Sequence, residues 1–291
     1  MSPHALWVAK HGNTSFYVPH VQEGKVDTSW NGLPWVYGEP GELFVLSVFE
    51  KVLKNGSECK RQGLAPPLVL DIGANEGFFG LLAGAWGCTS TMFEPQPGCV
   101  DQINNAIGAN RLGQWATVVP NPVSDTPIHI DVSTSPICYG GFPFHKYVRR
   151  TTKSDGRPPR DLDAYFRPDR IRKVPSVGIS TMYGSDFRPH VALIKIDVEG
   201  NELSILFDVL NLVRKGQVDN IIVEVTPGWW GKEYNDQNVD RLWQEFTHYG
   251  FRSIMQTDME DKGHRYADLR SMIRSIRSHR RAQGNIWLQR R

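Results

Sequence analysis

The stretch PLVLDIGANEG, residues 67–77, decides the fold of this chain. Its first half is a short apolar run bounded by Pro67 and Gly73, which is typical of a strand buried on both faces of a parallel sheet. Its second half, with Gly73 and Gly77, indicates a tight turn whose backbone can approach a ligand closely. A strand, a glycine turn and a helix in this order predict the first unit of an α/β domain that binds its ligand at the strand ends.

Strands and helices alternate along the rest of the chain. Strands are predicted at 90–94, 116–124, 127–132, 191–197, 220–225, 250–255 and 285–289, and helices at 42–54, 77–87, 100–107, 201–214 and 239–246. This alternation predicts one doubly wound, Rossmann-like α/β domain over residues 42–291. Residues 1–41, which are rich in Trp and Tyr, are expected to form an N-terminal arm that either covers the ligand cleft or packs on the sheet edge.

Composition excludes several classes of protein. The 291 residues are 40% hydrophobic and 22% charged, the mix of an ordinary globular protein. The net charge of +2 excludes a uniformly basic nucleic-acid coat, although a local patch is compatible with it. No apolar stretch reaches the roughly 18 residues of a membrane span. The four cysteines form no CxxC pair, so we expect no zinc site, and reduced thiols in a soluble cytoplasmic protein.

The charges of the glycine turn narrow the choice of ligand. Asp71 and Glu76 flank the turn, which contains no Lys or Arg and matches neither GxGxxG nor GK[ST]. A pyrophosphate would be repelled, whereas a cationic nucleoside such as S-adenosylmethionine would be attracted. Glu94, at the end of the next predicted strand, suits the hydroxyls of a ribose. The alternative is that the glycines only form a turn and that Glu94 is a solvated strand end.

A second acidic centre follows the predicted strand at 191–197. Lys195, Asp197 and Glu199 come at its carboxyl end, and Glu224 ends the next strand, so these groups are expected at the mouth of the cleft. They could hold a substrate hydroxyl, act as a base or ligate a divalent cation, although nothing in the sequence indicates a metal. Glu202 is interpreted as a charge that favours the start of a helix.

Four motifs together resemble the FkbM family of S-adenosylmethionine-dependent methyltransferases. They are DIGANEG at 71–77, FEPQP at 93–97, IKIDVEG at 194–200 and IVEV at 222–225, and the resemblance runs from about Glu42 to Leu288. It implies a seven-stranded, mostly parallel sheet whose last strand is antiparallel, and O-methylation of a hydroxyl. Carried over by position, the residues implied to bind the cofactor are Asp71, Gly73, Ala74, Asn75, Gly77, Phe78, Glu94, Pro95, Val123, Ser124 and Asp197. Asp197 and Glu199 are implied to face the transfer site. The residues predicted to be catalytic are Asp197, Glu199, Glu224 and Lys195.

The chain departs from the family in a basic insert at 134–178. Between Lys146 and Lys173 it carries ten Lys and Arg against four Asp. The insert is either a solvated loop or a lid that docks an anionic acceptor. An Arg-rich amphipathic helix is expected at about 265–281. The residues predicted to bind substrate are Trp35, Tyr37, Glu39, Tyr147, Arg149 and Arg150.

Three functions remain open at this point. The first is O-methylation of a small-molecule or saccharide hydroxyl, and the second is methylation of RNA or another polyanion through the insert and the Arg-rich helix. The third is a methyltransferase-like module that binds a partner through its Trp-rich arm without catalysis. The sequence leaves the acceptor and the oligomeric state undetermined.

Overall fold

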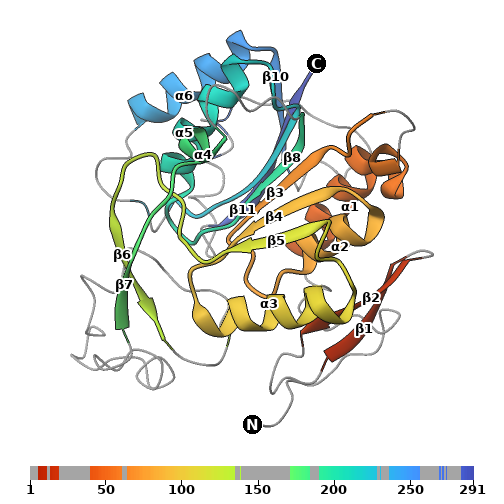
Figure 1. Ribbon diagram of the computed structural model, residues 1–291. Coiled ribbons are helices and arrows are strands. Elements are labelled where there is room, and N and C mark those ends of the chain that lie inside the picture. Colours follow the sequence, from red (N-terminus) through yellow and green to blue (C-terminus); the bar gives the residue numbers. More distant parts are fainter. Residues whose placement is uncertain are drawn as a thin grey trace.

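A seven-stranded sheet forms the centre of the molecule, with the strand order β10-β11-β9-β8-β3-β4-β5 (Figure 1). Its strands are β3 (Leu68–Ile72), β4 (Thr89–Phe93), β5 (Ala116–Val119), β8 (Val191–Ile196), β9 (Asn220–Val225), β10 (Phe251–Met255) and β11 (Gly284–Arg290). β11 runs antiparallel to β9 and β10, and the other neighbouring strands are parallel. The predicted Rossmann-like α/β fold, with its last strand antiparallel, is therefore confirmed.

The structure, a computed structural model, describes most of the chain. The described residues are 6–11, 14–19, 40–60, 64–134, 138, 171–183, 190–227, 230, 236–255, 269, 271, 273 and 283–291. The predicted substrate residues Trp35, Tyr37, Glu39, Tyr147, Arg149 and Arg150 lie outside these ranges, as does most of the Arg-rich segment 265–281.

Helices cover both faces of the sheet (Figure 1). On one face lie α1 (Pro40–Leu53), α2 (Phe78–Trp86) and α3 (Pro97–Ala109), and on the other lie α4 (Ile179–Met182), α5 (Glu202–Arg214) and α6 (Asp236–His248). Two short 3₁₀ turns, η2 (Lys54–Gly56) and η3 (Glu58–Lys60), follow α1. Because successive strand residues point to opposite faces, Val69 and Leu193 join the core under α1 and α2, whereas Leu70 and Ile194 join the core under α5 and α6.

An antiparallel hairpin precedes α1. It consists of β1 (Leu6–His11) and β2 (Thr14–Pro19), which the sequence analysis did not predict. The Gly-Asn pair between the strands is a hairpin signal that could have revealed it. Phe16 packs on Phe78 with ring centroids 5.6 Å apart, and the Tyr17 amide donates to Asn110 Oδ1 at 2.6 Å. The described part of the arm therefore packs on α2 and α3, and the division at residue 41 stays a prediction.

A separate two-stranded ribbon joins a strand just before the basic insert to a strand near the end of the insert. β6 (His129–Ser133) pairs antiparallel with β7 (Ile171–Pro175), so residues 171–175, which were assigned to the basic insert, form a strand. The strand predicted at 116–124 ends at Val119 because Pro120 and Pro122 cannot donate to a ladder. The rest of the insert between residues 139 and 170 lies outside the described residues.

The cysteines correct the expectation of reduced thiols. Cys59 is bonded to Cys88 and Cys99 to Cys138, which leaves no free cysteine in the chain. The partners are 29 and 39 residues apart in sequence, and only the fold brings them together. Spacing alone therefore could not reveal the pairs.

Candidate functional site

The turn between β3 and α2, here called the glycine loop (residues 73–77), has an uncommon backbone. Gly73, Asn75 and Gly77 have φ angles of 77°, 51° and 81°. A Cβ atom on Gly73 would lie 1.7 Å from the carbonyl oxygen of Asp197. Only glycine fits at position 73, because the loop passes directly beside the carboxyl end of β8.

Glu94 and the end of β4 hold the glycine loop in place. The Asn75 amide donates to Glu94 Oε2 and the Gln96 amide to Glu94 Oε1, each at 2.9 Å. The amides of Gly73 and Ala74 donate to the Phe93 carbonyl. Burial raises the pKa of Glu94 to about 7, although the hydrogen bonds from Gln96 and Asn75 oppose the shift. Glu94 thus lies beside the loop, where the sequence analysis expected a ribose-binding carboxylate.

Asp71 lies beneath the same loop and is fully buried. Its Oδ2 accepts a hydrogen bond from the Gly80 amide at 3.0 Å, and its Oδ1 lies 3.5 Å from Lys195 Nζ. Burial raises the pKa of Asp71, and Lys195 opposes that shift. Since both oxygens face the protein, this geometry indicates that Asp71 supports the loop and the first turn of α2.

The remaining predicted cofactor residues lie around this loop or on the neighbouring strand end. Phe78 is buried against Phe16 and Phe79, so its backbone rather than its ring borders the loop. The Val123 carbonyl accepts a hydrogen bond from Asn201 Nδ2 at 2.9 Å, and Ser124 Oγ lies 3.1 Å from Ser204 Oγ. Ala74 and Pro95 are also buried. These contacts tie Val123 and Ser124, which the family resemblance implies to bind the cofactor, to the start of α5.

Lys195 joins the glycine loop to the second acidic centre. Its Nζ lies 3.2 Å from Asp197 Oδ2, 3.5 Å from Asp71 Oδ1 and 3.5 Å from the Gly73 carbonyl oxygen. Burial lowers the pKa of Lys195, but Asp197, Asp71 and Glu42 raise it by more, so it stays above its ordinary value. The ammonium is a fixed cation here, which argues against a role as a base.

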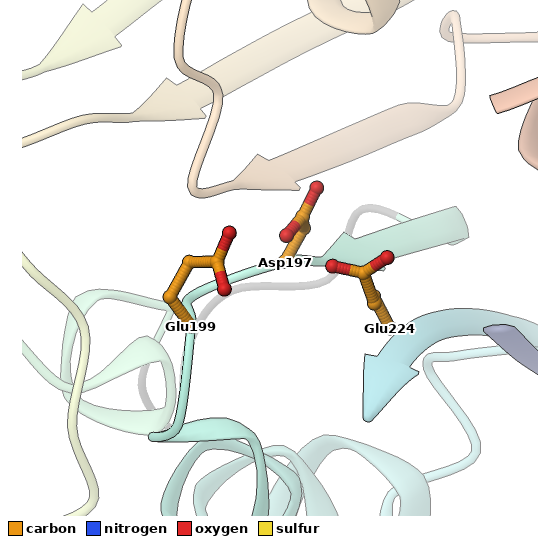
Figure 2. Close-up of side chains that lie close together, drawn as sticks. All are labelled: Asp197, Glu199 and Glu224. Atoms are coloured by element: carbon orange, nitrogen blue, oxygen red, sulfur yellow. The ribbon is translucent and has the colours of Figure 1, made fainter. Parts of the chain in front are cut away.

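Three carboxylates meet at the carboxyl ends of β8 and β9, and we call them the acidic triad (Asp197, Glu199 and Glu224). One oxygen from each lies within 4.8 Å of the others, and Figure 2 shows the side chains turned toward a common space. Strand register explains the meeting of two of them, because Ile196 pairs with Val223 and the residues that follow are Asp197 and Glu224. Glu199 reaches the same point because its φ of 54° turns the chain after β8.

Burial and neighbouring carboxylates raise the pKa values of two members of the acidic triad, Glu199 and Glu224. The pKa of Glu199 rises to about 8, first through burial and then through Asp197 and Glu202. The pKa of Glu224 is also raised by burial and by Asp197 and Glu199. Lys195 is the cation that lowers both values. Glu199 can therefore accept a proton near neutral pH, and the three carboxylates together can hold a divalent cation.

Glu42 is a member of this centre that the sequence analysis did not place among the catalytic residues. Burial raises its pKa to about 7, with Asp197 and Asp71 adding to the shift and Lys195 opposing it. Its Oε2 is buried and accepts no hydrogen bond from the described residues. In the sequence it is one acidic residue in the first turn of a helix, a feature too common to mark a site.

Comparison with known families supplies the decisive observation. Residues 71–253, more than half of the chain, match the model of the methyltransferase FkbM domain. The chain belongs to the FkbM family of methyltransferases. It is therefore a methyltransferase that depends on S-adenosylmethionine, the cofactor that this family implies. A search of curated proteins finds no match to this sequence.

Among solved structures, the matches include other methyltransferases at low sequence identity. A SAM-dependent methyltransferase from Agrobacterium tumefaciens is 11% identical, with a TM-score of 0.42 over 100% of this chain and 71% of its own. The METTL16 MTase domain is also 11% identical, with a TM-score of 0.41 over 85% of this chain and 67% of its own. A precorrin-6y C5,15-methyltransferase from Geobacter metallireducens is 10% identical, with a TM-score of 0.34 over 83% and 89%. The family assignment itself rests on the residues matched by the family model.

No helix within the described ranges is long and apolar enough to cross a bilayer.

Proposed function

We propose that this methyltransferase O-methylates a hydroxyl group on a small-molecule or saccharide acceptor. The observation that carries the proposal is the position of the acidic triad beside the glycine loop. The Asp197 amide donates to the Ile72 carbonyl at 2.9 Å, one residue before Gly73. The group that would accept a proton from a hydroxyl therefore adjoins the loop that would hold the methyl donor.

The residues of the glycine loop fit S-adenosylmethionine. Its positive-φ residues Gly73, Asn75 and Gly77 leave the backbone open to close approach, and Glu76 and Glu94 supply carboxylates for a cationic nucleoside with ribose hydroxyls. When bound, this cofactor supplies a methyl group on a sulfonium, which is already activated for transfer. The protein then has to align the acceptor with the donor and remove its proton.

We assign proton acceptance to Glu199. A general base works best when its pKa lies near the working pH, and the pKa of Glu199 rises to about 8. Its Oε2 is buried and accepts no hydrogen bond from the described residues, so the oxygen can accept one from an acceptor hydroxyl. Asp197 and Glu224 would orient that hydroxyl, and Lys195 would balance the charge of Asp197.

A divalent cation is the second candidate for the role of the acidic triad. Three carboxylate oxygens within 4.8 Å of one another match the ligands that Mg²⁺ prefers. A cation would hold the acceptor oxygen and lower the pKa of its hydroxyl. Turnover that persists in EDTA supports Glu199 as the base, whereas turnover lost in EDTA and restored by Mg²⁺ assigns the triad to a cation.

The acidic triad also weighs against the polyanion alternative. Phosphates of RNA would be repelled by the carboxylates at the transfer site, unless the basic insert outside the described residues holds them away from it. The non-catalytic alternative is disfavoured because membership of the FkbM family and an intact triad both suit catalysis.

An assay with methyl-labelled S-adenosylmethionine tests the proposal. Wild-type protein is incubated with sugars and other polyhydroxylated small molecules, with amines, and with RNA, and label is sought in each product. Label in an alkali-stable methyl ether supports the proposal. Label only in RNA, or only on an amine, contradicts it.

The cytoplasmic location expected from the sequence is not supported by the cysteines. Disulfides persist chiefly in oxidising compartments, and both pairs of this chain are bonded. We therefore propose that the protein works where its disulfides are maintained. Thiol titration of protein isolated under non-reducing conditions should find no free cysteine, and four free thiols would contradict this location.

A further inference from the structure

Glu202, the first residue of α5, is fully buried. Its position in the sequence predicts a charge that favours a helix start, a role that an exposed carboxylate fills equally well. In the structure three groups donate hydrogen bonds to it. The Gly200 amide and the Thr226 hydroxyl reach Oε1 at 2.8 and 2.7 Å, and the Trp230 indole reaches Oε2 at 2.6 Å.

This arrangement fits an ionised Glu202. All three partners donate, so the carboxylate needs no proton of its own to complete the network. Burial raises the pKa of Glu202, and the hydrogen bonds from Thr226, Trp230 and Gly200 oppose the shift. A buried charge is costly unless it is fully hydrogen-bonded, and a helix start does not require one. The network therefore needs a reason beyond the stability of α5.

The three partners of Glu202 come from the segments that carry two members of the acidic triad. Gly200 follows Glu199, and these two residues have φ angles of 120° and 54°. Thr226 comes two residues after Glu224, at the end of β9. One carboxylate thus joins the turn that carries Glu199 to the strand end that carries Glu224.

Trp230 extends the same connection to the loop after β9. Its ring packs on the core beneath α5 and α6, and its indole N–H is held by Glu202. A donor on a rigid ring fixes the direction of the carboxylate more firmly than a flexible side chain would. Glu202 is therefore fixed on one side by Trp230 and holds the two triad segments on the other.

We propose that Glu202 is a positioning residue for methyl transfer, which sets the placement of Glu199 relative to Glu224. This inference rests on the proposed function of the acidic triad. Glu202 touches neither donor nor acceptor in this account and acts only through the Gly200 turn and the end of β9. Its loss should lower turnover without weakening the binding of S-adenosylmethionine, because the hydrogen bonds that hold the glycine loop come from Glu94, the Phe93 carbonyl and Lys195.

The first test is Glu202→Gln, which keeps the size of the side chain. The amide oxygen can still accept from Gly200 and Thr226, but the amide nitrogen would face the indole N–H, so the Trp230 bond and the charge are lost. We expect kcat to fall by about 10- to 100-fold, the range that follows from a small misplacement of reacting groups. The Kd for S-adenosylmethionine should stay within about twofold of wild type, since donor binding and transfer geometry are separate contributions.

Two variants of Thr226 test the same hydrogen-bond network independently of Glu202→Gln. Thr226→Val removes the hydroxyl donor at nearly constant shape, whereas Thr226→Ser keeps it. We expect the valine variant to lose turnover in the same direction as Glu202→Gln, and the serine variant to retain most of it. Glu245→Gln is the control for loss of a carboxylate, because Glu245 pairs with Arg214 on the partly exposed surface of α6.

A spectroscopic measurement tests the network without any acceptor. The indole N–H of Trp230, identified by the signal that Trp230→Phe removes from the NMR spectrum, should move upfield in Glu202→Gln as its hydrogen bond is lost. An unchanged indole signal would overturn the inference.

The kinetic outcomes separate the two proposals. Wild-type kcat in Glu202→Gln, or equal kcat in the two Thr226 variants, overturns the positioning role if Glu199→Gln and Glu224→Gln are inactive. Loss of turnover that merely parallels a loss of donor affinity and thermal stability overturns it too. Full turnover in Glu199→Gln and Glu224→Gln instead overturns the proposed function of the triad.

Discussion

The glycine loop can lie directly beside the carboxyl end of β8, which carries Asp197 of the acidic triad, because residue 73 is a glycine. Replacing it with alanine places a methyl group 1.7 Å from the Asp197 carbonyl oxygen at a φ of 77°. The backbone strain alone is worth about 1–3 kcal/mol, and relief of the clash must displace the glycine loop or the end of β8. We expect Gly73→Ala to weaken binding of S-adenosylmethionine by at least about tenfold, which corresponds to about 1.4 kcal/mol, measured by calorimetry.

The control for this change is Gly108→Ala. Gly108 lies near the end of α3, and a Cβ there would meet nothing within 4 Å. Alanine should be neutral or stabilise by up to about 1 kcal/mol, since glycine disfavours a helix. Donor affinity that is unchanged in Gly73→Ala would contradict the close packing of the loop against Asp197.

The raised pKa of Glu199 predicts that the rate of methyl transfer depends on pH. This pKa is raised to about 8, mainly by burial, and only the ionised form can accept a proton. The rate of methyl transfer with saturating donor should therefore increase as pH rises through about 8. This increase with pH should disappear in Glu199→Gln, together with most of the rate of methyl transfer. A rate independent of pH between about 6 and 9 would rule out a titrating base in the rate-limiting step.

At the scale of elements, the disulfides tie segments that secondary structure leaves separate. Cys59 in η3 is bonded to Cys88 just before β4, and Cys99 in α3 is bonded to Cys138 in the basic insert. A disulfide that closes a loop of this size raises the free energy of unfolding by about 3–4 kcal/mol. Denaturation in urea should therefore shift to lower concentration with a reducing agent. An unchanged midpoint would indicate that the bridges do not stabilise the protein.

The second bridge lies against the glycine loop, which gives it a separate consequence. Cys138 Sγ lies 2.9 Å from Asn75 Oδ1, and Cys99 Sγ lies 3.7 Å from the same atom. Cys99→Ser with Cys138→Ser should weaken donor binding severalfold, because Asn75 loses a packed neighbour. The double change Cys59→Ser with Cys88→Ser is the control, and it should lower stability without changing the donor Kd.

The elements differ in how far sequence alone predicts them. The buried strands β3, β8 and β9 carry apolar runs bounded by Pro, Gly or charge, so their predicted limits lie within one or two residues of the observed ones. β1, β2 and β7 pair outside the main sheet, and they were not predicted from the sequence. The disulfides and the place of Glu42 arise from contacts between distant segments, which carry no local signal.

At the scale of the molecule, the site concentrates buried carboxylates that cost stability at high pH. Burial raises the pKa values of Glu42, Glu76 and Glu94 to about 7 and that of Glu199 to about 8, above the ordinary 4.5. The folded state therefore binds more protons than the unfolded state in this range. The stability that these groups contribute is complete below pH 4.5 and is lost as pH rises through 7 to 8.

The melting temperature should accordingly fall between about pH 5.5 and pH 8.5, and less so in Glu42→Gln, which removes one of these groups. Thermal melts in buffers matched for ionic strength measure this. A melting temperature that rises steadily over the same range would contradict the burial of the site.

The acidic triad should act in methyl transfer beside a glycine loop that binds the donor independently of it. Transfer of labelled methyl from S-adenosylmethionine to a hydroxyl acceptor, measured together with donor affinity for wild type and Glu199→Gln, tests this expectation most directly. We predict a labelled methyl ether with wild type, turnover lowered by about 100-fold or more in the variant, and donor affinity within about twofold. Equal turnover in the two proteins, or a wild-type protein that binds no S-adenosylmethionine, would contradict the account.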